Sequence, residues 1–344
     1  MREKLKTKFK DFFSAIGRLG KKFKNLVYEL KVKLHNVLHK KQKVRKIGQR
    51  KRNDMIFYCL MLVLPVTQFC IFYIGVNFNS ILMSFRAYDY ASNTWSFVGW
   101  DNFSKVIKDI GTQYVLIQSA KNSLIVYFVG LIVGIPLSLF FSYYIYKKMP
   151  VSGLFKIMLF LPSVISSIAM VVMYSYFVEN AIPEVANKML GIKMEGLIAN
   201  PQTAFDTILF YSIWAGFGGN ILMYSGAMNS ISDSVVEAAK LEGITPIKEF
   251  FKITLPLIYP TLVTFLVVGV AGIFTNQMNL FSFFGGNAEY RLYTFGYYLY
   301  RNTQGATMSD YPYLAAMGLL MTLVAVPVTL IFRYVLEKVG PKVD

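Results

Sequence analysis

The sequence predicts an all-α membrane protein with six transmembrane helices and a basic, amphipathic helical arm at its N-terminus. Hydrophobic residues make up 55% of the 344 residues and charged residues only 16%, compared with about 25% in a typical soluble domain. Six stretches are apolar over the roughly 20 residues that a helix needs to cross a bilayer. They are residues 55–82, 124–146, 155–177, 205–228, 258–284 and 313–334. This composition argues against an ordinary soluble enzyme.

Almost all of the net charge lies in residues 1–53, which we expect to form a cytoplasmic arm preceding a membrane domain of residues 54–344. The formal net charge of the chain is +17, and the arm holds 19 of the 36 basic side chains but only three acidic ones. Its apolar side chains recur at spacings of three and four, which indicates a helix with one apolar and one basic face. Such a helix suits an anionic membrane surface. Docking on a partner protein and binding of nucleic acid are the alternatives, and no groove-reading motif supports the latter.

The distribution of basic residues also predicts the topology of the membrane domain. Cytoplasmic connections carry an excess of Lys and Arg, which places the N-terminal arm in the cytoplasm, and six spans return the C-terminus to that side. The turn between the second and third stretches carries Lys147, Lys148 and Lys156 without an acid, whereas residues 86–119 carry balanced charge. The first stretch is too long for a secretory signal, and about fifty residues precede it.

The sequence contains none of the short motifs that would indicate an enzyme. It has no G-x-x-x-x-G-K-[ST] phosphate loop, no H-E-x-x-H and no C-x-x-C, the patterns that hold a nucleotide or a metal ion. It also lacks a G-x-S-x-G nucleophile motif. We therefore expect neither catalysis nor a metal or cofactor bound by this chain.

The connection between the fourth and fifth stretches carries the most specific pattern in the chain. It fits the spacing E-A-A-x3-G-x9-I-x-L-P. The matching residues are Glu237, Ala238, Ala239, Gly243, Ile253, Leu255 and Pro256. An isolated E-A-A is common, but seven matches at fixed spacing on the expected cytoplasmic side make a strong signal.

The first part of this connection predicts a short helix over about residues 234–241. Ser232 or Asp233 can cap its N-terminus, because both side chains accept hydrogen bonds from free backbone N–H groups. Gly243 suits the left-handed residue that commonly follows a helix. The small side chains of Ala238 and Ala239 would let a partner surface approach closely.

A second short helix is expected after the glycine. Thr245 and Pro246 would start it, since proline is favoured in a first helical turn. Leu255 and Pro256 would end it before the fifth span. Residues 232–257 would then form a helix–turn–helix on the cytoplasmic face.

With this loop, the sequence resembles the permease subunits of ABC importers. Over about residues 55–338 it is similar to the larger permease of sugar importers of the maltose-transporter type. Family positions are also met at residues 122–123, 161–162 and 214–216. Two positions depart from the family: Glu242 replaces the usual Asp, and residues 285–287 replace the usual T-x-G-G-P. The resemblance implies the six-helix fold of type I ABC importer permeases.

The resemblance implies a transport subunit that imports a sugar, in particular an oligosaccharide, while a separate subunit hydrolyses ATP. Loop 232–257 would dock on that ATPase with Glu237 as its anchoring charge, and ATP and Mg would bind there. The expected partners are a second, related permease, two ATP-binding subunits, an extracellular solute-binding protein, the sugar and membrane lipid, but no nucleic acid. The expected location is the cell membrane.

Sugar contacts are expected near the middle of the fourth and fifth spans, where the resemblance places them. A sugar needs paired hydrogen-bonding groups and aromatic faces. The candidates are Trp214, Gly216, Asn220, Thr275, Asn276, Asn279 and Phe281, with Phe274 as a further apolar face. Packing between helices is the alternative role, because small and amide side chains also serve there.

Three other functions remain open at this point. The first is an ABC importer permease that carries a non-sugar solute in place of a sugar. An ion-coupled secondary transporter would need buried carboxylates or broken inverted repeats. A membrane-anchored nucleic-acid-binding protein would leave the seven-residue signature unexplained.

Overall fold

The structure is a computed structural model that describes residues 28–29 and 47–341. The predicted amphipathic arm therefore lies almost wholly outside the described residues. The chain divides into two compact units, Met1–Val76 and Asn77–Asp344. In the first unit, helix α2 (Ile47–Gln68) continues into a π-helical segment, η1 (Phe69–Gly75). The expected boundary after residue 53 falls inside α2.

Three helices in the described residues are long and apolar enough to cross a membrane, and each contains one predicted span. Asn53–Ser84 combines α2, η1 and α3 (Val76–Ser84), and Tyr114–Tyr146 combines α5 (Tyr114–Val129), η2 (Gly130–Gly134) and α6 (Ile135–Tyr146). The third is α17 (Tyr311–Val339). Their apolar side chains are largely exposed, Leu60 and Leu64 among them, as expected for helices whose solvent is lipid.

The third predicted span is not one straight helix. Helix α7 (Ser152–Val164) and the helix Ser167–Leu190 meet at 110°. The latter comprises α8 (Ser167–Tyr176), η3 (Phe177–Ala181) and α9 (Ile182–Leu190). The backbone is extended at Ile165 and Ser166, the two residues of the break. Pro162 lies in the last turn of α7, where its missing N–H and its ring weaken the helix.

The fifth predicted span is also wrong as a continuous helix. Helix α14 (Tyr259–Ala271) ends at Ala271, and non-helical backbone follows up to α15 (Leu280–Phe284). In this segment the side-chain oxygen of Asn276 accepts a hydrogen bond from the N–H of Met278 at 2.8 Å, an interaction that competes with helix formation. Met278 and Asn279 both have positive φ. We call residues 272–279 the broken segment.

The fourth predicted span is helix α10 (Ala204–Asn229), which packs along α6 and α7. It is 26 residues long, but its polar residues and glycines lower its hydropathy, so it is not counted among the apolar helices above. The bent pairs raise the number of candidate spans in the described part of the chain from three to five. The count of six spans stays a prediction.

A two-stranded hairpin departs from the all-α expectation. Strand β1 (Arg86–Asp89) pairs antiparallel with β2 (Thr94–Phe97). Helix α4 (Asp101–Thr112) follows it and packs against α17. The hairpin was not predicted because each strand has only four residues, too few for a clear alternation.

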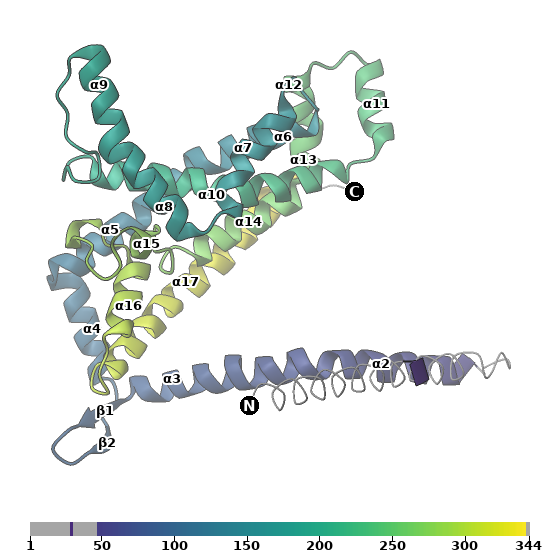
Figure 1. Cartoon of the computed structure of the whole chain (residues 1–344). Helices are drawn as coiled ribbons and strands as arrows, with labels where there is room; N and C mark the ends of the chain where they lie inside the picture. The colour runs from purple at the N-terminus through teal and green to yellow at the C-terminus, as the bar shows by residue number, and fades with distance from the viewer. Residues whose placement is uncertain (1–27, 30–46, 342–344) are drawn as a thin grey trace, which may run out of the picture. The chain divides into compact units, whose positions relative to one another are not determined.

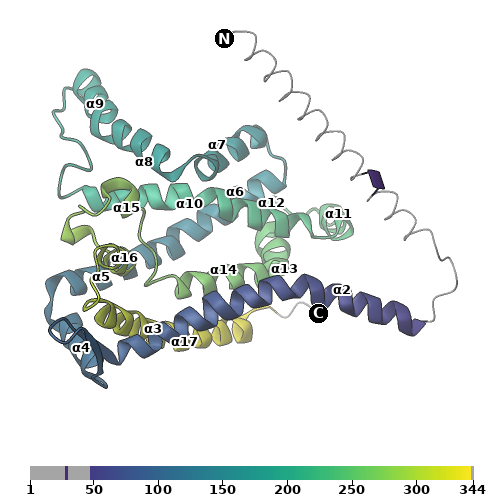
Figure 2. The same ribbon diagram turned by 60° about the horizontal axis from the view of Figure 1, so that its bottom comes forward.

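Two opposite ends of the second unit matter for function (Figures 1 and 2). One holds the connection after α10, with helices α11 (Asp233–Leu241), α12 (Pro246–Glu249) and α13 (Leu255–Leu257). There Tyr259 Oη donates to the Leu336 carbonyl at the end of α17. We call this the loop end. The other, the hairpin end, holds β1, β2, α4 and the starts of α5 and α17, and Tyr313 Oη donates there to Asp109.

The broken segment is supported by the chain that follows it. Helix α16 (Phe295–Gln304) starts against it, where a side chain at Gly296 would collide with the Thr275 carbonyl oxygen. Buried Asn122 of α5 donates from Nδ2 to the carbonyls of Arg291 at 2.7 Å and Tyr293 at 2.8 Å. These bonds satisfy backbone groups that membrane lipid would leave unpaired.

We therefore expect Asn122→Leu to destabilise the fold. Leucine has the same number and branching of side-chain heavy atoms as asparagine but no donor for the two carbonyls, and each unsatisfied buried group costs about 1–3 kcal/mol. The thermal unfolding midpoint in detergent should fall clearly, whereas that of Asn187→Leu, an exposed control on α9, should not. Equal midpoints for the two variants would contradict this account of the broken segment.

Candidate functional site

The loop end carries the seven-residue signature in two short helical pieces. The first, α11, begins one residue before the predicted start, and Ser232 is its N-cap with extended backbone. The Ser232 side chain makes no capping bond, however, and contacts the Ser234 hydroxyl at 2.8 Å. The position of the cap was therefore predicted correctly and its hydrogen bond was not.

Gly243 ends α11 as predicted, with φ of +68°. Its N–H donates to the Lys240 carbonyl at 3.0 Å, and the N–H of Ile244 donates to the Ala239 carbonyl at 3.1 Å. This pair of bonds is the Schellman motif, which needs a left-handed residue and so favours glycine. The signature glycine thus fixes the direction in which the chain leaves α11.

The second helical piece is longer than predicted. Pro246 starts α12 as expected, and helix continues through the π-helical segment η4 (Phe250–Thr254) into α13. Leu255 and Pro256 do not end it; the chain bends by 71° only after Leu257, where α14 begins. Pro256 lacks an N–H, and such a gap in the ladder accompanies local unwinding.

The signature residues divide into an outward and an inward set. Glu237 and Ala238 are exposed, whereas Ala239 is buried and Ile253, Leu255 and Pro256 are half-buried. Two apolar side chains near the turn are also turned outward: Leu241 is 90% exposed and Ile247 is 73% exposed. They are the most exposed apolar side chains within residues 232–257. The sequence reasoning missed Leu241 and Ile247 because they lie in the variable positions of the signature.

A buried ion pair attaches the second piece to the end of α6. Lys147 Nζ donates to both oxygens of Glu249, at 2.8 and 2.9 Å. Glu249 is only 4% exposed. Tyr143 Oη donates to the Pro246 carbonyl at 2.8 Å, and the ring centroids of Tyr143 and Phe250 are 5.0 Å apart. We call these contacts the loop clamp.

The loop clamp was not predicted from the sequence. Lys147 was interpreted only as a cytoplasmic charge, and Glu249 lies among the nine variable positions of the signature. The Lys147 ammonium lies 6.0 Å from the ring centroid of Tyr143 and 5.9 Å from that of Tyr146. The only sequence signal is an acid in the loop and a base after the second span, and their pairing needs the fold.

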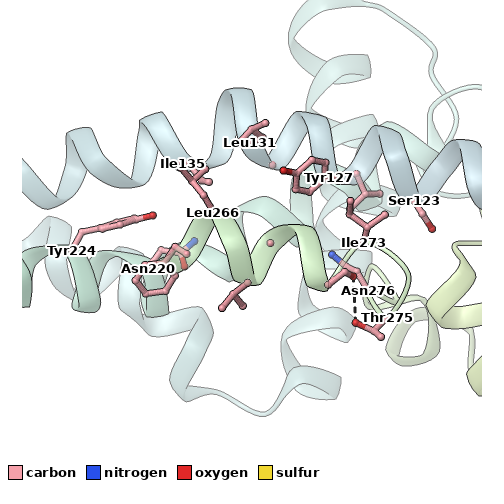
Figure 3. Close-up of a pocket in the computed structure, with 16 residues that line it drawn as sticks. Ser123, Tyr127, Leu131, Ile135, Asn220, Tyr224, Leu266, Ile273, Thr275 and Asn276 are labelled. Carbon is pink, nitrogen blue, oxygen red and sulfur yellow. Dashed lines mark hydrogen bonds between the residues drawn. The ribbon is translucent and has the colours of Figure 1, made fainter. Parts of the chain in front are cut away.

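A cavity of about 390 Å³ lies between α5, α10, α14 and the broken segment (Figure 3). It contains three of the seven predicted sugar contacts: Asn220 from α10 and Thr275 and Asn276 from the broken segment. Thr275 Oγ1 donates to the Gly272 carbonyl at 3.3 Å. Phe274 packs on the Phe295 ring and does not line this cavity.

Two tyrosines that the sequence reasoning missed also line the cavity. Tyr127 comes from α5 and Tyr224 from α10 (Figure 3). The Tyr224 hydroxyl is buried and has no hydrogen-bond partner within the described structure. A buried polar group without a partner is costly, so this hydroxyl is available to a ligand. The cavity is lined by apolar walls with a few polar groups, as ligand sites usually are.

The other predicted sugar contacts lie outside this cavity. Trp214 lines a separate apolar pocket with Tyr174, and Gly216 is exposed on α10. Asn279 Nδ2 lies 3.5 Å from the Ser212 hydroxyl, and the Phe281 ring packs edge-on against Tyr300 at 5.0 Å. The break after Ala271 interrupts the helix between α14 and the residues Asn279 and Phe281. Trp214 and Gly216 lie on α10, before this break.

A family model described as "Binding-protein-dependent transport system inner membrane component" matches residues 127–344, which is more than half of the chain. The chain belongs to this family. The predicted resemblance to ABC importer permeases is thereby confirmed, and the family is one of inner-membrane transport components.

Two curated relatives illustrate the range of the family. A probable ABC transporter permease of Mycoplasma pneumoniae is 28% identical over 195 residues, covering 55% of this chain and 57% of the relative. The maltose/maltodextrin transport system permease of Klebsiella aerogenes is 27% identical over 187 residues, covering 52% of this chain and 35% of the relative. The chain thus spans only about a third to three-fifths of these relatives.

A solved structure confirms the fold class. It is that of a bacterial ABC transporter involved in the import of the acidic polysaccharide alginate. The matching chain has a TM-score of 0.67 and 19% sequence identity, and the match covers 86% of this chain and 100% of that one. The architecture is therefore the permease fold of that importer.

The loop clamp makes a quantitative prediction. Glu249→Ala should destabilise the chain by less than the ~3–5 kcal/mol typical of a fully buried pair, because the Lys147 side chain loses its partner but stays 16% exposed. The double variant Lys147→Met with Glu249→Leu should recover most of this loss, since apolar residues of similar size can replace a buried ion pair at little cost. Thermal unfolding in detergent measures both. A double variant no more stable than Glu249→Ala would show that the pairing is not what holds the loop.

Proposed function

We propose that this chain is a transmembrane permease subunit of an ATP-driven ABC importer that carries an oligosaccharide. The observation that carries the proposal is the loop end: the complete signature forms two helical pieces, with Glu237, Leu241 and Ile247 facing outward. An exposed surface with one acidic and two apolar side chains is suited to docking on the ATPase subunit. A second, related permease, two ATP-binding subunits and an extracellular solute-binding protein complete the importer, and ATP and Mg bind the ATPase.

The loop clamp suggests how ATP-driven movement enters the membrane domain. Closure of the ATPase dimer displaces the outward surface of α11. The buried pair of Lys147 and Glu249 makes the second helical piece move together with α6. Helix α6 packs along α10, which carries Asn220 into the cavity. Movement at the loop end thereby changes access to the cavity, as alternating access requires.

The cavity favours a neutral, polar solute. Its hydrogen-bonding side chains come from Ser123, Tyr127, Asn220, Tyr224, Thr275 and Asn276, and no ionised side chain is among its lining residues. Hydroxyl and amide groups match the hydroxyls of a sugar, and Phe265 and Tyr127 offer ring faces. An ion-coupled transporter would instead need buried carboxylates, and an anionic solute would need basic groups.

The proposed orientation places the loop end and both termini in the cytoplasm. Lys147, Lys148 and Lys338 support it, because basic residues collect on the cytoplasmic side. The hairpin end then faces outward, toward the solute-binding protein. The basic arm would lie on the inner surface of the membrane, where anionic lipid attracts it.

The ATPase-docking role of the loop can be tested by co-purification. Glu237→Ala should reduce recovery of the ATPase with the permease and abolish sugar uptake, because it removes the carboxylate that we expect to anchor the loop. Ser234→Ala, exposed on the same helix but outside the signature, should behave like the wild type. Full uptake and full ATPase recovery with Glu237→Ala would overturn the proposal.

The sugar site can be tested separately from docking. Losing one hydrogen bond to the solute costs about 1–1.5 kcal/mol, or roughly a tenfold change in affinity. Asn220→Ala combined with Asn276→Ala should therefore weaken uptake by at least that factor while ATPase recovery stays normal. Asn279→Ala, outside the cavity, is the matched control. If Asn279→Ala alone impairs uptake, the solute binds away from this cavity.

A further inference from the structure

The β1–β2 hairpin has two chemically different faces. Paired residues in an antiparallel ribbon share a face, and the faces alternate along each strand. The pairs Arg86 with Phe97 and Tyr88 with Trp95 lie on one face, and the ring centroids of Tyr88 and Trp95 are 4.9 Å apart. The other face carries only small or polar residues: Ala87, Asp89, Thr94 and Ser96.

The aromatic face extends beyond the strands. Phe85 stacks on Phe97 with ring centroids 6.5 Å apart, and it packs edge-on against Trp100 at 5.2 Å. Much of this cluster is nonetheless uncovered, since Phe97 is 78% exposed and Trp100 is 66% exposed. We call Phe85, Tyr88, Trp95, Phe97 and Trp100 the aromatic face.

Such a hairpin needs a partner for this face. The hairpin is not isolated, because β1 contacts α17, but a two-stranded ribbon adds little stability of its own. Leaving a Phe side chain exposed forgoes about 1.5–3 kcal/mol of burial energy. The polar face is already suited to water: Asp89 accepts hydrogen bonds from Ser92 Oγ at 2.8 Å and from the Ala91 N–H at 3.0 Å. The Ser92 hydroxyl oxygen also lies 2.8 Å from the Thr94 hydroxyl oxygen.

The position of the hairpin identifies that partner. One residue, Phe85, separates β1 from Ser84, where the first apolar helix ends. Asn102 fixes the backbone between the helix and β1, because its Nδ2 donates to the Ser84 carbonyl at 2.9 Å and to the Arg86 carbonyl at 2.8 Å. The ribbon is therefore held where an apolar helix leaves the bilayer, and it cannot extend far from the membrane surface.

We propose that the aromatic face lies in the headgroup layer of the outer leaflet, so that the hairpin is an interfacial anchor for the first apolar helix. Trp and Tyr collect at this depth because their rings are apolar while their N–H and O–H groups are polar. Arg86 shares the face and can extend its guanidinium toward phosphate while its stem stays apolar. The opposite face then meets water.

Tryptophan fluorescence of the full chain in phosphatidylcholine nanodiscs tests this directly. Trp214→Phe with Trp100→Phe leaves Trp95 as the only tryptophan. The matched control adds Trp95→Phe and Ser96→Trp, which moves the probe to the polar face one residue away. If the Ser96→Trp variant does not reconstitute, Thr94→Trp on the same polar face replaces it. Each probe is quenched by lipid brominated near the headgroup and by aqueous iodide.

At position 95 we expect strong quenching by the shallow bromolipid and at least threefold weaker iodide quenching than at position 96. Equal iodide quenching at the two positions would overturn the anchor. Shielding of position 95 that appears only after a second permease or a solute-binding protein is added would also overturn it, in favour of a protein interface. Neither result depends on sugar transport, so a failure here leaves the proposed function standing.

Discussion

The buried pair of Lys147 and Glu249 is the interaction on which the functional arrangement depends. It lies where α6 ends and where α12 of loop 232–257 begins the return toward the membrane. Glu249 is buried and the Lys147 side chain is only 16% exposed, so separating the pair would leave both charges poorly compensated. The second piece of the loop is thus held against α6, while Glu237 and Leu241 on α11 are exposed.

The sequence predicted the straight parts of the fold well. Residues 55–82, 124–146 and 313–334 lie in long helices, since hydropathy alone decides whether a segment can span lipid. It failed where the backbone breaks: at residues 165–166, in the broken segment and in the hairpin. A hydropathy window averages over local signals such as Pro162 before the first break and Asn276 in the broken segment. The broken segment also depends on tertiary contacts, such as the close approach of Gly296 and the hydrogen bonds of Asn122, which hydropathy cannot show.

The two parts of the candidate site were predictable to different degrees. The loop has fixed spacing and local signals, so Gly243 and Pro246 could be assigned to a left-handed residue and a helix start before the fold was known. The prediction of the sugar contacts assumed a continuous fifth helix. Once α14 ends at Ala271, Thr275 and Asn276 join Asn220 at one cavity, while Asn279 lies elsewhere. Tyr224 could be identified as a candidate only in the structure, where its hydroxyl is buried without a hydrogen-bond partner.

The claim that the loop and α6 move as one body is tested most directly by distance measurements in the assembled importer. Spin labels at Lys148→Cys and Lys248→Cys, with Cys59 and Cys70 replaced by Ser, report the separation across the loop clamp. The account predicts the same distance distribution without nucleotide and with ATP bound. A second pair, Lys248→Cys with Lys108→Cys at the hairpin end, should shift. A clamp distance that changes by several ångströms on ATP binding would contradict the account.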